Sequence, residues 1–226
     1  MIADERITAY INSLGSELTP ELLALEKEAL EKHVPIIKKE TQGILRFLLE
    51  LQQPKRILEV GTAIGFSALF MSEYSNKDCK ITTIEKVPMR LAEAEKNLAG
   101  DRYPHKDKIM LIKGEGLEVL RALAGQEETY DFIFLDAAKA QYMSFLPELM
   151  KLLPDRGMLV TDNVLQDGTV INSRYSITRR DRTIHSRMRE YLYSITHMKE
   201  LSTVILPVGD GITVSTRISP EQEDTP

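Results

Sequence analysis

The sequence of 226 residues predicts an α/β domain built around a mostly parallel sheet. Short apolar runs alternate five times with helical patterns, as in sheets whose strands are joined by helical crossovers. Acidic residues fall at or near the ends of these runs, and two β-like runs around a glycine turn close the chain. Because a chain of this length is long enough for one sizeable core and short for two, we expect one domain.

The N-terminal part predicts helices. Thr19 and Pro20 form a favourable helix start, and leucines follow at helical spacing among charged residues. The three predicted helices cover residues 4–14, 20–32 and 41–51. We therefore expect a helical extension over residues 1–53, a core over 54–218, and a disordered acidic tail over 219–226.

The stretch from Arg56 to Ser67 organises the predicted core. Its apolar residues form a buried first strand that breaks at Gly61, and a helical pattern follows from Phe66. A glycine at such a turn permits positive φ and close approach of a ligand, and the helix start offers free N–H groups. We therefore expect a small polar ligand here. The alternative is a turn whose glycines only ease packing.

The spacing of this loop indicates which ligand it binds. Gly61 and Gly65 match neither the dinucleotide loop nor the phosphate loop, and no lysine follows to hold a triphosphate. The second predicted strand ends in Glu85, about 20 residues on, where a doubly wound sheet places the carboxylate that binds ribose hydroxyls. Together with Glu59, this acid suits a cofactor that has a ribose and a cationic end, such as S-adenosylmethionine.

The rest of the core continues the alternation of strands and helices. The predicted strands cover residues 57–60, 81–85, 109–112, 130–135, 158–161, 203–207 and 212–216. The predicted helices cover residues 66–73, 88–98, 117–123 and 140–153. Because ligands of open α/β sheets lie beyond the carboxyl ends of the strands, the acids at these ends predict a site there.

Three oxygen-bearing side chains follow the fourth and fifth strands. Asp136, Asp162 and Asn163 would come together at the sheet edge, and oxygen ligands without histidine or cysteine select Mg²⁺ or a similar hard cation. The alternative for these residues is helix N-capping. Lys139 lies three residues after Asp136 and is predicted to act as a general base toward a hydroxyl, unless it is a solvated lysine at a helix start.

Composition limits the partners. The net charge of −5 and the pI of about 5.5 exclude a uniformly basic protein, so nucleic-acid contact would need a local patch. The single cysteine, Cys79, excludes a disulfide within one chain. Apolar runs stay well short of the roughly 18 residues of a membrane span, and the N-terminus lacks the plan of a signal peptide. We expect no membrane partner and a cytoplasmic location.

One basic patch interrupts the acidic chain. Between residues 174 and 189 the sequence contains six arginines and a single acid, Asp181. The arginines are Arg174, Arg179, Arg180, Arg182, Arg187 and Arg189. Arginines at this density suit phosphate contacts. The alternatives are a solvated helix face, or arginines at a dimer interface.

Four motifs together resemble the metal-dependent class I O-methyltransferases of the caffeoyl-CoA and catechol type. They are Glu59–Ser67, Phe134–Tyr142, Thr161–Leu165 and Leu206–Thr213. The resemblance implies a Rossmann-like seven-stranded sheet with an antiparallel C-terminal strand, and a homodimer. It also implies metal ligation by Asp136, Asp162 and Asn163 and catalysis by Lys139 and Asp136. The implied S-adenosylmethionine contacts are Glu59, Gly61, Thr62, Gly65, Ser67, Glu85, Gly114, Glu115 and Asp136. Glu115-Gly116 departs from the Asp or Ser followed by Ala of many members.

Within this family the segments 31–37 and 57–66 look most like bacterial tRNA 5-hydroxyuridine methyltransferases. This implies methylation of the 5-hydroxyl at the wobble position, giving 5-methoxyuridine, with the anticodon arm of tRNA as partner. The 5-hydroxyl neighbours the C4 carbonyl oxygen, so the pair can chelate a metal as a catechol does. The substrate-contact candidates are then Arg174, Arg179, Arg180, Arg182 and Tyr142.

Two alternatives remain open. One is a small-molecule O-methyltransferase with the same chemistry, acting on catechol, flavonoid or caffeoyl-CoA-like vicinal hydroxyls. The other is a module that binds the cofactor without catalysis. The presence of Asp136, Lys139, Asp162 and Asn163 argues against the second alternative.

Overall fold

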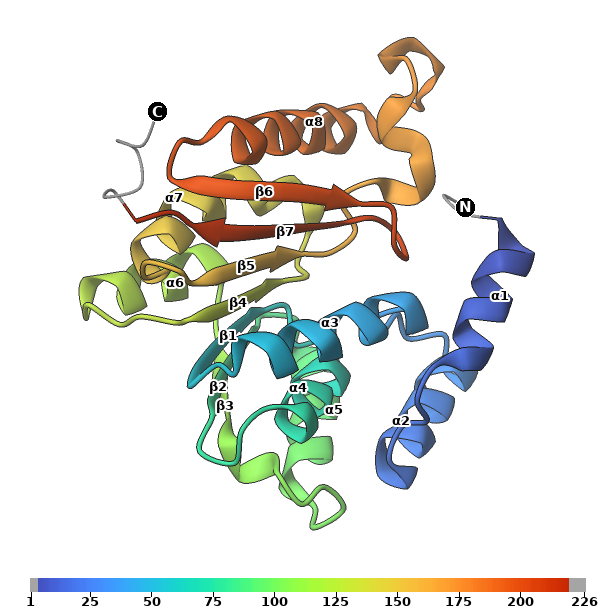
Figure 1. Cartoon of the computed structure of the whole chain (residues 1–226), viewed down its shortest axis with the longest axis vertical. Coiled ribbons are helices and arrows are strands. Elements are labelled where there is room, and N and C mark those ends of the chain that lie inside the picture. The colour runs from blue at the N-terminus through green and yellow to red at the C-terminus, as the bar shows by residue number, and fades with distance from the viewer. Residues whose placement is uncertain (1–3, 220–226) are drawn as a thin grey trace.

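A seven-stranded sheet forms the centre of the protein in a computed structural model, which describes residues 4–219 apart from the side chains of Asp167 and Arg174 (Figure 1). Its strands are β1 (Arg56–Val60), β2 (Lys80–Glu85), β3 (Ile109–Lys113), β4 (Phe132–Leu135), β5 (Met158–Thr161), β6 (Leu201–Leu206) and β7 (Ile212–Arg217). They lie in the order β3-β2-β1-β4-β5-β7-β6. The first five strands pair in parallel, whereas β7 pairs antiparallel with β5 and β6. This confirms the predicted fold class.

Helices cover both faces of the sheet (Figure 1). They are α1 (Glu5–Leu14), α2 (Pro20–Glu31), α3 (Lys39–Gln52), α4 (Phe66–Tyr74), α5 (Pro88–Ala99), α6 (Gly116–Gly125), α7 (Tyr142–Leu152) and α8 (Arg182–His197). Short 3-10 turns join them: η1 (Lys106–Lys108), η2 (Lys139–Gln141), η3 (Gln166–Ile171) and η4 (Arg174–Ser176). Every element predicted from the sequence is present, with ends that differ by at most two residues.

Two apolar cores lie on opposite faces of the sheet. Neighbouring side chains of β1 divide between them, because successive residues of a strand point to opposite faces. Leu58 joins the core that α6, α7 and α8 build, and Ile57 joins the core that α2, α3 and α4 build. The helices α2 and α3 of the predicted extension therefore share a core with the sheet.

Helix α8 is the element that sequence analysis missed. Four of its side chains are buried, and their spacing places them on one face of the helix: His185, Met188, Tyr191 and Ile195. The arginines between them lower its mean hydropathy, so the segment was interpreted as a basic patch rather than as a crossover helix.

Two further predictions concern the ends and the surroundings of the chain. Residues 220–226 of the predicted disordered tail lie outside the described residues. In the part that the structure describes, we find no helix that is both long enough and apolar enough to cross a membrane.

Candidate active site

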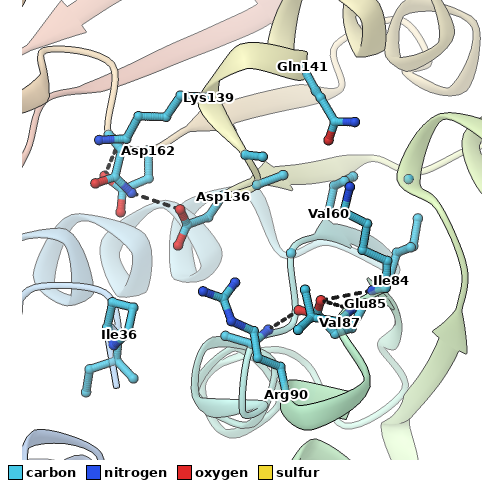
Figure 2. A pocket seen from close by; sticks show the side chains of 18 of the residues that line it. Ile36, Val60, Ile84, Glu85, Val87, Arg90, Asp136, Lys139, Gln141 and Asp162 are labelled. Carbon is cyan, nitrogen blue, oxygen red and sulfur yellow. Dashed lines mark hydrogen bonds between the residues drawn. The ribbon is translucent and has the colours of Figure 1, made fainter. Parts of the chain in front are cut away.

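A cavity of about 730 Å³ lies beyond the carboxyl ends of the parallel strands (Figure 2). Each of these strands contributes to its lining, because parallel strands end at the same edge of the sheet. The lining residues at strand ends are Val60, Gly61, Ile84, Glu85, Gly114, Asp136, Asp162 and Asn163. The sequence predicted most of this set, and the structure brings it together.

Gly61 lets two strand ends approach each other. Its φ is 109°, and a Cβ built at this position would lie 2.0 Å from the carbonyl oxygen of Asp136. The N–H of Asp136 in turn donates to the carbonyl of Val60 at 3.0 Å. The glycine is therefore required for packing and also lines the cavity, so both predicted roles of this turn are compatible.

Glu85 is fixed in the cavity wall by backbone donors. Its Oε2 accepts from the N–H of Ala63 at 2.9 Å, and its Oε1 accepts from the N–H groups of Lys86 and Val87 at 2.9 and 2.8 Å. These bonds hold the carboxylate at the end of β2, where a ribose would be expected to bind.

Glu59 and its neighbours form a sealed layer beneath the cavity. The fully buried carboxylate accepts from Ser67 Oγ and, at 2.5 Å, from Thr83 Oγ1, which also bonds Thr62 Oγ1 at 2.5 Å. Burial raises the pKa of Glu59 to about 7, against the lowering effect of the two hydroxyl donors. Glu59, Thr62, Gly65 and Ser67 do not line the cavity. Their contact with a cofactor stays a prediction.

Glu115 connects two residues at the rim of the cavity. Its carboxylate accepts from Lys86 Nζ and from Gln141 Nε2, both at 2.9 Å. These two bonds lower the pKa of Glu115. Although Glu115 does not line the cavity, both of its partners do. The predicted adenine contact at this residue remains a prediction.

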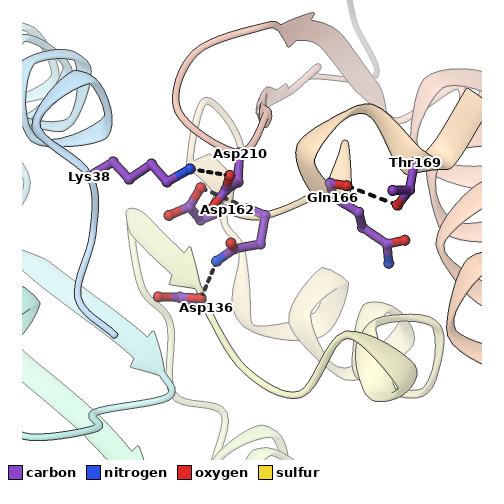
Figure 3. Close-up of polar contacts among 7 residues, drawn as sticks. Lys38, Asp136, Asp162, Gln166, Thr169 and Asp210 are labelled. Atoms are coloured by element: carbon purple, nitrogen blue, oxygen red, sulfur yellow. Dashed lines mark hydrogen bonds and ion pairs between the residues drawn. The ribbon is translucent and has the colours of Figure 1, made fainter. Parts of the chain in front are cut away.

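Asp136, Asp162 and Asn163 form one polar cluster, of which Figure 3 labels the two aspartates. Asn163 Nδ2 donates to Asp136 Oδ1 at 2.8 Å, and the N–H of Asn163 donates to Asp162 Oδ1 at 2.7 Å. Burial, followed by the charge of Asp136, raises the pKa of Asp162 to about 8, and burial also raises the pKa of Asp136. None of the three caps a described helix, which removes the alternative role that the sequence left open.

Lys139 enters the same cavity from η2 (Figure 2). Its charge opposes the rise in the pKa of both Asp136 and Asp162. The side chain is half-buried, so it is not the fully solvated lysine of the alternative interpretation.

Four charged residues of the cavity wall were missed by sequence analysis: Lys38, Lys86, Arg90 and Asp210. Lys38 and Asp210 form an ion pair at 2.5 Å (Figure 3), and Arg90 enters from the first turn of α5 (Figure 2). In the sequence, Asp210 lies in the predicted closing turn and within the Leu206–Thr213 motif, where it has no assigned role. Because Lys38 lies 172 residues away in sequence, no local motif links the two.

The arginine patch divides into two groups, and none of its described side chains lines the cavity. Three arginines donate to backbone carbonyls: Arg182 Nε to Ile177 at 3.2 Å, Arg187 Nη1 to Ala140 at 2.8 Å, and Arg189 Nη1 to Val170 at 3.2 Å. Arg179 and Arg180 are exposed and form no ion pair with the described residues. The side chain of Arg174 lies outside the described part.

Tyr142 corrects one prediction. Its side chain is fully buried, its hydroxyl donates to the carbonyl of Asp162 at 3.1 Å, and its ring packs edge-on against Tyr191. In this buried position, Tyr142 holds the backbone of the metal-ligand candidate Asp162, and its side chain is not exposed for contact with a substrate.

The chain is similar to known proteins over most of its length. A family model described as O-methyltransferase matches residues 12–218. The catechol O-methyltransferase of Niastella koreensis is 31% identical over 171 residues, which cover 74% of this chain and 76% of the relative. Caffeoyl-CoA O-methyltransferase 1 of Arabidopsis thaliana is 29% identical over 211 residues, which cover 88% and 79%.

Solved structures show the same architecture. A candidate caffeoyl-CoA O-methyltransferase from Staphylococcus aureus has a TM-score of 0.82 at 29% identity, covering 94% of this chain and 98% of that one. An O-methyltransferase from Bacillus cereus, in complex with SAH, has a TM-score of 0.81 at 20% identity, covering 94% and 97%, and supports the fold alone. With the family match over nearly the whole chain, these findings establish that the protein belongs to the O-methyltransferase family of enzymes.

Proposed function

We propose that this protein transfers the methyl group of S-adenosylmethionine to a hydroxyl oxygen that has a second oxygen on the neighbouring carbon. One observation carries the proposal: the oxygen cluster of Asp136, Asp162 and Asn163 shares a single cavity with the strand ends predicted to bind the cofactor. A metal-ligand candidate and a cofactor site in one cavity would hold both reactants in line, which is a large part of catalysis by positioning.

The strand ends suit the cofactor. Glu85 would bind the ribose hydroxyls, Gly61 would let the cofactor approach the backbone, and the negative charge of Asp136 would face the cationic end. The sealed layer of Glu59, Thr83 and Ser67 would hold the floor of this site in place.

The oxygen cluster suits a hard divalent cation such as Mg²⁺. Two carboxylates stand close enough for the charge of Asp136 to raise the pKa of Asp162, a repulsion that a cation would relieve. A bound Mg²⁺ would supply Lewis acidity toward the two substrate oxygens. Lys139 lines the same cavity, and its amine, in the neutral form, would accept the proton of the reacting hydroxyl.

A small vicinal hydroxyl compound is the acceptor that the relatives favour. The names of two of them specify catechol and caffeoyl-CoA, which both present adjacent oxygens on an aromatic ring. The cavity volume of about 730 Å³ is in the range of sites for small molecules.

5-Hydroxyuridine at the wobble position of tRNA is the second candidate. The exposed Arg179 and Arg180 favour it, because they lie just before α8, which packs against the turn η2 that carries Lys139. Such arginines could contact the phosphates of an anticodon arm. The reacting atom would again be a hydroxyl oxygen, here next to a carbonyl oxygen instead of a second hydroxyl.

A homodimer and a cytoplasmic location belong to the same proposal. Helix α1 supports the dimer, because it buries none of its residues within the described chain. Its exposed apolar side chains are Ile7, Tyr10, Ile11 and Leu14. A second copy would cover them.

The test is transfer of labelled methyl from S-adenosylmethionine to catechol, caffeoyl-CoA, and bulk tRNA from cells that lack the gene, each with Mg²⁺ and with EDTA. We expect Mg²⁺-dependent labelling of at least one acceptor. Labelling of small phenols alone would support the first candidate, and labelling of the undermethylated tRNA but not wild-type tRNA would support the second. Equal labelling in EDTA would overturn the cation's role.

A further inference from the structure

A second cavity of about 680 Å³ adjoins the first. Val34, Pro35 and Arg90 line both cavities, so the segment between α2 and α3, together with the first turn of α5, forms the wall between them. The far side of the second cavity consists of α2, α5 and the loop before η1. A molecule that enters the first cavity could therefore extend over this wall into the second.

Positive charge predominates in the second cavity. Besides Arg90, it is lined by the cations Lys32, Lys96 and Arg102 and by two acids, Glu28 and Glu93. Arg102 is paired with Glu28 at 3.0 Å, whereas Lys32 and Lys96 form no ion pair with any residue from 4 to 219. The whole chain has a net charge of −5, so these two unpaired lysines make the charge beside the cavity opposite in sign to that of the chain.

The floor of this cavity combines apolar surface with one unsatisfied hydroxyl. Leu25, Ala29 and Ile64 supply apolar side chains. Tyr103 also lines the cavity; it is 5% exposed, and its buried hydroxyl has no hydrogen-bond partner in the described structure. Buried hydroxyls are normally hydrogen-bonded, so this one indicates a polar group that a ligand would provide.

We propose that the second cavity binds a phosphate ester group carried by the methyl acceptor, so that one acceptor spans both cavities across the Val34–Pro35 wall. This inference rests on the proposed methyl transfer. Lys32 and Lys96 contact the phosphate, the apolar floor packs against the carbon skeleton or base beside it, and Tyr103 donates a hydrogen bond. A phosphate ester next to an apolar or aromatic group occurs in a coenzyme A thioester and in an RNA strand, but not in a free catechol.

The kinetic test uses a double variant, Lys32→Gln with Lys96→Gln, in the full chain. The matched control is Lys27→Gln with Lys77→Gln, which neutralises two exposed lysines that do not line the cavity. Each is assayed with catechol, caffeoyl-CoA and an anticodon stem-loop RNA that carries 5-hydroxyuridine. We expect the KM of the phosphate-bearing acceptor to rise about tenfold in the cavity variant alone, with kcat and the catechol KM unchanged.

The acceptor whose KM rises identifies the source of the phosphate. An unchanged KM for both phosphate-bearing acceptors would overturn the inference, as would an equal rise for catechol, which would point to a general effect on the first cavity.

A binding test separates this inference from the proposed reaction. Calorimetric titration of the protein with adenosine 3′,5′-bisphosphate, in the presence of saturating S-adenosylmethionine to occupy the first cavity, needs no methyl transfer. We expect the wild type and the control variant to bind, and the cavity variant and Tyr103→Phe to bind several-fold more weakly. Because Tyr103→Phe keeps the ring and removes only the hydroxyl, it preserves the packing. Equal binding by all four proteins, or none by the wild type, would overturn the inference.

Discussion

Two acidic groups lie near the same sheet edge and differ in what surrounds them. Glu59 is sealed inside β1, and hydroxyls of Ser67 and Thr83 occupy its oxygens. Asp136 and Asp162 line the cavity instead, where Asp136 accepts from the side-chain amide of Asn163 and Asp162 accepts from its backbone N–H, rather than from a set of hydroxyl donors. The difference is one of position along the strand, because Glu59 lies within its strand whereas the two aspartates follow theirs.

This difference shows that an acid near a strand end has two possible roles. Inside the strand, as for Glu59, its carboxylate is taken out of water and its polar neighbours stabilise the fold. At the last residue of the strand, as for Glu85, or one residue beyond it, the same group reaches the ligand side. Each prediction below tests this contrast, beginning with the largest expected effect.

Asp162→Ala should abolish turnover, by at least about a thousandfold, because it removes a proposed cation ligand and leaves Asp136 without its neighbour. S-Adenosylmethionine affinity should stay within a few-fold, since Asp162 is not among the predicted cofactor contacts. Steady-state assays and calorimetry measure the two effects. The control is Asp78→Ala, an exposed aspartate outside the cavity. Near-normal turnover by the Asp162 variant would contradict the cation site.

Glu59→Gln should instead change the pH dependence of stability. The folded chain holds a proton on Glu59 up to about pH 7, whereas the unfolded chain loses it near the ordinary value of 4.5. Between these values the folded state binds more protons, so the unfolding free energy falls as pH rises, by at most roughly 3 kcal/mol from this group. Below pH 4.5 this contribution is fully present, and above pH 7 it is lost.

The measurement is urea unfolding of both proteins without cofactor from pH 4.5 to 8. In the glutamine variant, the unfolding free energy should lack this part of its decrease with pH, because an amide does not titrate. The amide can still be hydrogen-bonded, since the neighbouring hydroxyls can accept as well as donate. Parallel curves for the two proteins would show that the pKa of Glu59 is ordinary, and the contrast with the aspartates would then disappear.

The arginines show a similar contrast, between side chains that bond the protein backbone and side chains that are exposed to a ligand. Arg187→Ala should lower kcat about tenfold with little change in the KM for S-adenosylmethionine, because Arg187 holds the carbonyl of Ala140 next to Lys139. Arg189→Ala is the matched control, since it holds Val170 in η3 instead. Equal losses in both variants would indicate a general loss of structure.

The smallest effect is expected from Arg179→Gln with Arg180→Gln. These exposed side chains form no hydrogen bond or ion pair within residues 4–219, so stability and catechol turnover should be unchanged. If RNA is the acceptor, its affinity should fall and the slope of log K against log salt should decrease by about 1 to 2. Filter binding across a salt series checks this. An unchanged slope for a bound RNA would place its phosphate contacts elsewhere.

Much of the site could be predicted because it depends on strand ends. The alternation of apolar runs located β1, β2, β4 and β5 within two residues, and parallel strands must present their carboxyl ends together. The positions of Gly61, Glu85, Asp136, Asp162 and Asn163 in one cavity follow from that rule. Contacts between segments far apart in sequence do not, so the Lys38–Asp210 pair and the second cavity were missed.

The sequence by itself determined the sheet, its crossovers and the polar residues at its edge, because period and strand ends are local properties. Only the tertiary structure decided which polar groups reach the cavity. It buried Glu59 and Tyr142. It also used three arginines of α8 to hold backbone carbonyls of neighbouring segments. The physical reason is that exposure depends on what other segments pack against a residue, and no local pattern contains that information.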